Sequence, residues 1–201
     1  MYKILAITNR HLCNNDFLTQ IEKICTLNEN KSKVKSVSIV LREKDLPENE
    51  YKDLAAKVLE ICEKNNTECL LHTYYKVAIE LNCKKIHLPL HVLKSNPDVC
   101  KEFDEVGVSI HSVSEAIEAV NLGATYITAG HIFETDCKKN LEPRGLSFLS
   151  SVCSSVNIPV FAIGGISLSN AQEAIDAGAD GVCIMSGLMN CKNPKEFIQN
   201  I

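Results

Sequence analysis

The chain has 201 residues, of which 45% are apolar and 23% charged, and its 21 Lys and Arg against 25 Asp and Glu leave a formal net charge of -4. This composition is that of a soluble globular protein that can bury a sizeable core, and it excludes disordered and collagen-like chains. The slightly acidic balance disfavours nucleic acid as a partner. Divided by eight, the length gives about 25 residues per unit, enough for one strand and one helix of a small (β/α)8 TIM barrel.

Short apolar runs without polar alternation recur along the chain, as is typical of buried parallel strands. In chain order they cover Tyr2–Thr8, Ser36–Leu41, Cys69–Leu71, Lys85–Leu88, Gly107–Ile110, Tyr126–Ala129, Pro159–Ile163 and Gly181–Met185. Segments with helical spacing lie between them, and the helix expected over Tyr75–Leu81 is short. The alternation predicts one α/β barrel domain over residues 1–201, with an open sheet of six or seven strands as the alternative.

A repeated segment supports the barrel. Residues 112–124 align without a gap with residues 167–179, and seven positions are identical. Two units of about 27 residues fit into that offset, close to the barrel unit length. We expect Ser112 and Ser167 to cap helix starts, Glu115 to complete a capping box, and Gly123 and Gly178 to follow the helix ends.

The ten cysteines include no C-x-x-C pair, which disfavours a zinc site or a redox dithiol. The apolar run at the start of the sequence is too short for a signal peptide or a membrane span. We therefore expect a cytoplasmic protein without a membrane partner, whose thiols are mostly buried and inert.

Short glycine-containing turns follow the last two expected strands. Gly164 and Gly165 come after the seventh, and Ser186 and Gly187 after the eighth. Glycine lets the backbone approach a ligand, and barrels commonly hold phosphate in these two loops. Tight turns alone would explain either pair, but together they predict a phosphate site.

A long charged segment, residues 130–145, follows the sixth expected strand in a chain whose other loops are short. Long loops in compact domains often serve as lids or binding loops. His131 comes directly after the strand, so its side chain can reach the barrel mouth and exchange protons near neutral pH. The other histidines have weaker claims, although His87 and His111 also lie near strand ends.

Arg42 and Lys44 follow the second expected strand. Two cations at a strand end suit a phosphorylated or carboxylated ligand. A solvated charged loop explains them equally well.

Together, Leu41–Lys44, Ser109–Ser112, the segment from His131 to Lys139, Ala162–Ile166 and the Ser186-Gly187 turn resemble the thiamine phosphate synthase/TenI superfamily. The resemblance runs from about Tyr2 to Met189. It implies a (β/α)8 barrel that works on thiazole phosphates in thiamine biosynthesis.

Individual positions indicate which branch of the superfamily, synthase or TenI tautomerase, this chain resembles more. The resemblance implies that a synthase holds magnesium partly through an Asp after the third strand, where this chain reads His72-Thr73-Tyr74. It also implies an acidic residue after the fourth strand, where this chain has Leu88–Val92. Magnesium needs oxygen ligands, so these differences count against that site. By contrast, Gly130-His131-Ile132-Phe133 and the residues that follow closely resemble the TenI thiazole tautomerases, in which that histidine is catalytic.

The resemblance thus points to an isomerase without metal or organic cofactor, which converts a 2-carboxythiazole phosphate to its aromatic tautomer. His131 would relay the proton as the single acid and base. The expected substrate contacts are a phosphate site of Gly164, Gly165, Ser186 and Gly187, a carboxylate-orienting or closing set of Arg42, Lys44, Thr135 and Lys138, and Ser109. The family resemblance also suggests a homodimer.

Two alternatives stay open. One is a thiamine phosphate synthase, a transferase that condenses a pyrimidine diphosphate with the thiazole phosphate. The other is a non-catalytic ligand-binding or regulatory protein that retains the barrel.

Overall fold

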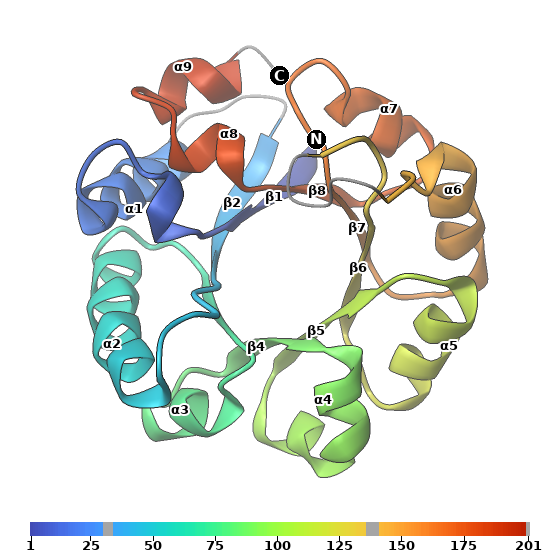
Figure 1. Ribbon diagram of the computed structural model, residues 1–201, viewed down its shortest axis with the longest axis horizontal. Helices are drawn as coiled ribbons and strands as arrows, with labels where there is room; N and C mark the ends of the chain where they lie inside the picture. The colour runs from blue at the N-terminus through green and yellow to red at the C-terminus, as the bar shows by residue number, and fades with distance from the viewer. Residues whose placement is uncertain (30–33, 136–140, 200–201) are drawn as a thin grey trace.

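The computed structural model describes residues 1–29, 34–135 and 141–199, and within them eight parallel strands close into a barrel in the order β1 to β8. Helices surround the strands on the outside (Figure 1). The strands are β1 (Tyr2–Ile7), β2 (Val34–Leu41), β3 (Cys69–His72), β4 (Lys85–Pro89), β5 (Glu105–Ile110), β6 (Tyr126–Gly130), β7 (Val160–Ile163) and β8 (Gly181–Ile184). The α-helices are α1 (Phe17–Cys25), α2 (Glu48–Lys64), α3 (Tyr75–Glu80), α4 (Leu90–Ser95), α5 (Val113–Asn121), α6 (Gly145–Ser155), α7 (Ala171–Asp176), α8 (Ser186–Met189) and α9 (Pro194–Gln199). Short 3-10 helices are η1 (Arg10–Leu12), η2 (Thr26–Glu29) and η3 (Pro97–Glu102).

The predicted barrel is confirmed, and the open sheet is excluded because β1 pairs with both β2 and β8. All eight expected strands form, with ends that differ by one or two residues. The largest differences are at β2, which begins at Val34, and β5, which begins at Glu105. Both additional stretches are paired, Val34 with Tyr2 and Glu105 with Lys85.

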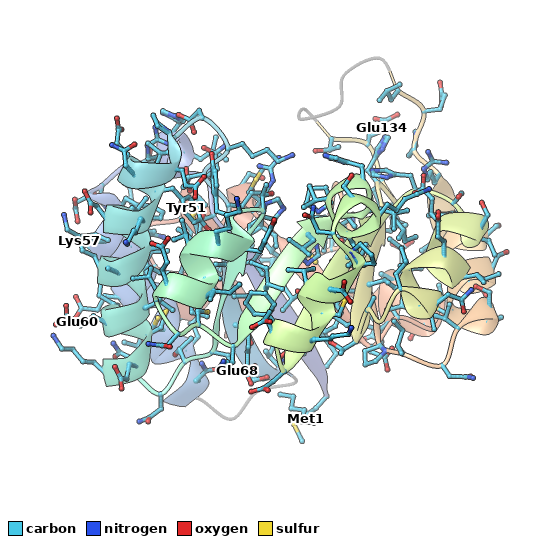
Figure 2. All side chains as sticks on the ribbon, turned by 90° about the horizontal axis from the view of Figure 1, so that it is seen from below. Met1, Tyr51, Lys57, Glu60, Glu68 and Glu134 are labelled. Carbon is cyan, nitrogen blue, oxygen red and sulfur yellow. The ribbon has the colours of Figure 1, made fainter. Side chains whose placement is uncertain are left out.

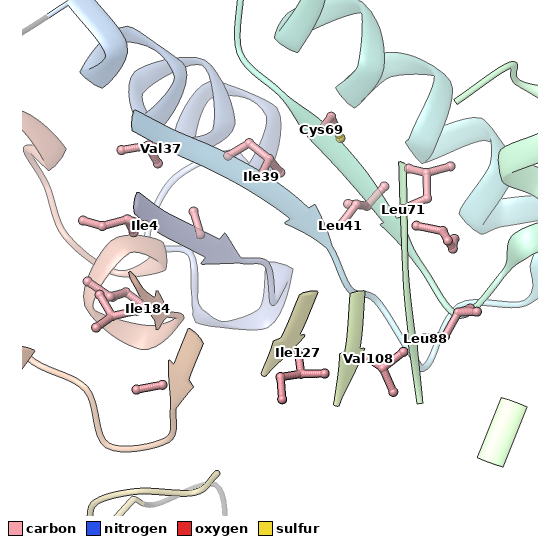
Figure 3. Close-up of a cluster of buried hydrophobic side chains, with 14 of the residues drawn as sticks. Ile4, Val37, Ile39, Leu41, Cys69, Leu71, Leu88, Val108, Ile127 and Ile184 are labelled. Carbon is pink, nitrogen blue, oxygen red and sulfur yellow. The ribbon is translucent and has the colours of Figure 1, made fainter. Parts of the chain in front are cut away.

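Side chains alternate between the helix layer and the barrel interior along each strand, as the period of two requires. On β2, Val37, Ile39 and Leu41 belong to the large apolar core between strands and helices, whereas Val40 belongs to the cluster inside the barrel. Figure 3 shows a sector of that outer core, with side chains of several strands directed to the helix layer. The interior cluster consists of Leu5, Ile7, Val40, Leu70, Tyr126, Phe161 and Cys183.

Two aromatic rings fill the barrel interior. Tyr126 and Phe161 pack edge to face with ring centroids 5.4 Å apart. A Cβ atom on Gly107 would overlap the Tyr126 ring, and one on Gly181 would lie 2.6 Å from the Phe161 ring. The two glycines thus make room for the two rings.

The repeated segments form α5 and α7, but the two helices begin differently. Ser112 caps α5 as predicted, accepting a 3.1 Å hydrogen bond from the Glu115 backbone N–H. The Glu115 carboxylate accepts from the backbone N–H of His111, one residue earlier than in a capping box. The expected Ser167 cap is wrong, because α7 begins only at Ala171.

The later start of α7 has a local cause. Asn170, which stands where the first segment has Glu115, accepts from the Ser167 N–H and donates to the Gly165 carbonyl. These side-chain bonds hold residues 167–170 in a turn that competes with the helix. Gly123 and Gly178 follow their helices with φ of +95° and +106°, as predicted for helix ends.

Nine of the ten cysteines lie in the described residues, and these nine are free thiols. Five of them are buried: Cys25, Cys62, Cys69, Cys83 and Cys183. Burial raises the pKa of the Cys183 thiol, which keeps it protonated and unreactive. None of the helices formed by the described residues has the length and apolar character needed to cross a bilayer.

Candidate active site

A cavity of about 920 Å³ opens at the carboxyl ends of the strands. In Figure 2 this end carries Glu134, opposite Met1 and Glu68 at the other end of the barrel. Eight of the ten predicted site residues line the cavity: Arg42, Lys44, Ser109, His131, Thr135, Gly164, Gly165 and Ser186. Gly187 is absent from the lining, and Lys138 lies outside the described residues, as does Cys137.

The loops after β6 and β7 lie against each other. The backbone N–H of Ile132 donates to the Ile163 carbonyl, and that of Phe133 donates to the Gly164 carbonyl, both at 3.0 Å. Gly164 and Gly165 have φ of +95° and +68°. A Cβ atom on Gly164 would overlap the Cβ of His131. Glycine is therefore required here by loop packing, and its open backbone is compatible with the predicted phosphate site.

His131 is 5% exposed and lines the cavity beside Gly164. Its Nε2 lies 3.2 Å from the carbonyl oxygen of Leu141, which can only accept, so Nε2 carries a hydrogen in this contact. In the neutral ring Nδ1 then keeps a lone pair. The His131 carbonyl accepts from the Arg144 N–H, which fixes the backbone on both sides of the ring.

The two residues predicted in the turn after β8 lie in different surroundings. Ser186 is exposed at the cavity and begins α8. Gly187 packs against α9, where a Cβ would lie 2.6 Å from the Phe197 ring. Packing thus accounts for Gly187, whose part in phosphate binding stays a prediction.

Arg42 and Lys44 form the cationic side of the cavity, and a buried carboxylate holds the segment that carries them. Glu43, 3% exposed, accepts hydrogen bonds from the Thr8 hydroxyl at 2.6 Å and from the Arg10 backbone N–H and guanidinium at 3.1 Å. The same Thr8 hydroxyl accepts from the Arg42 N–H at 2.9 Å. Glu43 therefore anchors the segment from which Arg42 and Lys44 reach the cavity.

Two histidines occupy inward-facing positions under this cationic side. His72 ends β3 and His87 lies on β4, with stacked rings 5.4 Å apart. His87 contacts the Tyr126 hydroxyl through Nδ1 at 2.9 Å and the Ser109 hydroxyl through Nε2 at 2.8 Å. Ser109 also accepts from Thr128 at 3.2 Å. A buried polar chain thus holds Ser109 at the cavity wall.

The positive charges at the mouth of the cavity lower the pKa of both histidine rings. Burial, together with the positive charges of Arg42 and Lys44, lowers the pKa of His87 to about 3. Burial and the same neighbours, with His87, hold the pKa of His72 well below its ordinary value. Both imidazoles are therefore neutral at pH 7, in a positive field that favours an anionic ligand.

His72 and His87 were not among the predicted contacts. The signal that could have found them is strand parity, because both stand one residue away from outward-facing apolar positions on short strands. Glu43 was missed because it reads as part of a solvated charged loop.

A family profile described as thiamine monophosphate synthase matches residues 4–188. The chain belongs to this family. A protein named thiamine-phosphate synthase from Fusobacterium nucleatum is 32% identical over 203 residues, covering 99% of this chain and 95% of the relative. A second of that name, from Clostridium acetobutylicum, is 31% identical over 199 residues, covering 97% and 90%. The solved structure of thiamine phosphate pyrophosphorylase from Pyrococcus furiosus has a TM-score of 0.77 at 24% identity, covers 99% of this chain and 93% of that one, and shares the fold.

These relatives correct the enzyme class expected from the sequence. The resemblance of residues 130–139 favoured an isomerase over a transferase, and this assignment is wrong. The curated relatives that match nearly the whole chain are named thiamine-phosphate synthase, which is a transferase. The residues around His131 therefore do not establish a separate activity.

Proposed function

We propose that this chain is a transferase of the thiamine-phosphate synthase type, which joins a pyrimidine diphosphate to a thiazole phosphate and releases diphosphate. The observation that carries the proposal is that one cavity is lined both by Gly164 and Gly165 and, from β2, by Arg42 and Lys44. A glycine turn suits the single phosphate of one substrate, and the paired cations suit the diphosphate of the other. The names of the relatives agree with this assignment.

The chemistry is a displacement at carbon. The bond between the pyrimidine's methylene carbon and a diphosphate oxygen breaks, and its electron pair leaves with the diphosphate. The thiazole nitrogen supplies the pair for the new carbon–nitrogen bond. Holding both substrates in one cavity favours this reaction, since proximity lowers its entropic cost.

On the thiazole side, Gly164, Gly165 and Ser186 would hold the phosphate, and His131 would contact the thiazole substrate beside them. Ser109 and Thr135, which also line the cavity, would contact the substrates between the two anionic ends. The buried chain from Tyr126 through His87 supports this assignment for Ser109, because it fixes the hydroxyl position before a ligand arrives.

The direct test offers the purified protein both phosphorylated precursors and measures condensed product and released diphosphate in equal amounts. Lys44→Gln is expected to lower kcat/KM at least about tenfold, the effect of losing one charge-assisted contact. Lys57→Gln removes an exposed charge from α2, outside the lining of the cavity, and is the matched control.

Absence of product from the wild-type protein, with and without added magnesium, would contradict the proposed function. Binding of both precursors without turnover would instead identify a ligand-binding protein.

A further inference from the structure

A side pocket of about 230 Å³ lies between the ends of β2, β3 and β4. It shares Lys44, His72, Pro89 and His91 with the main cavity, so the two spaces join. Its polar groups are mostly hydrogen-bond donors: the Lys44 ammonium, the imidazoles of His72 and His91, and the Thr73 hydroxyl. This composition suits an anion.

The carboxylates near this pocket already have partners. Glu43 is the one carboxylate among the described residues that line it, and its oxygens accept from Thr8 and from Arg10. In the main cavity, Glu115 accepts from the His111 N–H, and Glu118 pairs with Lys94.

Magnesium, which the resemblance implies for synthases, does not fit these residues. It prefers six oxygen ligands, usually including one or two carboxylates. In the described parts of the chain, no group of three or more His, Cys, Asp or Glu side chains is placed to hold a metal ion. His72 ends β3 and His91 lies in α4, directly after β4, and imidazole nitrogens are poor magnesium ligands.

His72 is the most informative of these side chains. It is 5% exposed, and its Nδ1 lies 2.7 Å from the Thr73 hydroxyl. Its Nε2 has no hydrogen-bond partner among the described residues, and the side chain lines both spaces. A buried ring nitrogen that opens onto a cationic pocket is a ready donor to an anionic oxygen.

We propose that Lys44, His72 and His91, with Arg42 beside them, bind the diphosphate group directly, without a divalent cation. The inference rests on the proposed function for the identity of the anion. When the carbon–oxygen bond breaks, the departing diphosphate gains negative charge. Arg42 and Lys44 then supply the positive charge, and the two imidazoles supply hydrogen bonds. The Thr73 hydroxyl donates to Nδ1 of His72, which leaves the one hydrogen of the neutral ring on Nε2.

The test is calorimetric titration of the full chain with inorganic pyrophosphate in an excess of EDTA, repeated with magnesium in place of EDTA. We expect saturable binding in EDTA that magnesium does not strengthen. Lys44→Gln and His91→Gln are both exposed substitutions that spare the core, and each should weaken this binding at least about tenfold, or about 1.4 kcal/mol. Lys57→Gln should bind like the wild type.

Pyrophosphate binding that requires magnesium, or that both substitutions leave unchanged, would overturn the inference. The two proposals fail in different ways. Condensation that occurs only with magnesium would retain the transferase and reject the metal-free site. Pyrophosphate binding in EDTA without condensation under any condition would retain the anion site and reject the transferase.

Discussion

The hydroxyl of Thr8 donates a 2.6 Å hydrogen bond to Glu43, and both side chains are buried although they stand 35 positions apart in the chain. Thr8 follows β1 and Glu43 follows β2, so the bond joins the ends of two neighbouring strands. Through Thr8 it also reaches the backbone of Arg42. The position of the cationic side of the cavity thus depends on one buried carboxylate.

Glu43→Gln should weaken that anchor while preserving its shape. The amide cannot accept all the bonds that the carboxylate accepts, and Arg10 loses a charged partner, so we expect the free energy of unfolding to fall by about 1–3 kcal/mol. The KM for the pyrimidine diphosphate should rise more than that for the thiazole phosphate. Urea unfolding and steady-state kinetics check these two effects. The control is Glu63→Gln, an exposed position on α2, and equal effects of the two substitutions would contradict the anchoring role.

His87 predicts how stability depends on pH. Its pKa is about 3 in the folded protein and 6.5 ordinarily, so between these values the unfolded chain binds a proton that the folded chain does not. The free energy of unfolding should therefore decrease as the pH falls from about 6.5 towards about 3. His72 acts in the same direction.

His87→Gln should flatten this dependence, although it lowers stability at pH 7 by removing hydrogen bonds to Tyr126 and Ser109. Urea titrations over that pH range measure the slope. The exposed His91→Gln serves as the control and should retain the wild-type slope. An unchanged slope in His87→Gln would show that other groups cause the pH dependence.

Gly164 and Gly145 offer a matched pair of substitutions. Both have positive φ, +95° and +76°, but a Cβ on Gly164 would overlap His131, whereas one on Gly145 would meet no atom within 4 Å. Gly145→Ala should cost about 1–2 kcal/mol of stability from backbone strain alone. Gly164→Ala should cost more and raise the KM for the thiazole phosphate at least about tenfold, because the turn and His131 must both move. Equal effects on that KM would exclude Gly164 from the phosphate site.

His131→Gln tests the thiazole side of the cavity. The Gln amide nitrogen can take the place of Nε2 and donate to the Leu141 carbonyl, so the fold should persist, but the lone pair of Nδ1 is lost. We expect kcat/KM for the thiazole phosphate to fall about tenfold or more, with the pyrophosphate affinity unchanged. Wild-type kinetics would remove His131 from the site.

Much of the framework follows from local patterns. The apolar runs predicted eight strands, and the repeat predicted the glycines that end α5 and α7, because burial and left-handed backbone each restrict the residue type. The glycine turns and Arg42 with Lys44 also predicted which loops meet, since parallel strands carry these loops to the same end.

Other features depend on contacts between distant segments. Glu43 is buried only because Thr8 and Arg10 satisfy it, and nothing next to it in the sequence signals that. The late start of α7 likewise reflects bonds from Asn170 that replace a helical turn. The predicted enzyme class was wrong because it relied on one distinctive segment, residues 130–139. The relatives, by contrast, match nearly the whole chain.

The rings of Tyr126 and Phe161 have a consequence for ligand access. Seated over Gly107 and Gly181, they fill the barrel interior, so no ligand passes through the molecule. In the proposed reaction, both precursors would enter, and both products would leave, at the carboxyl ends of the strands, where the cavity opens.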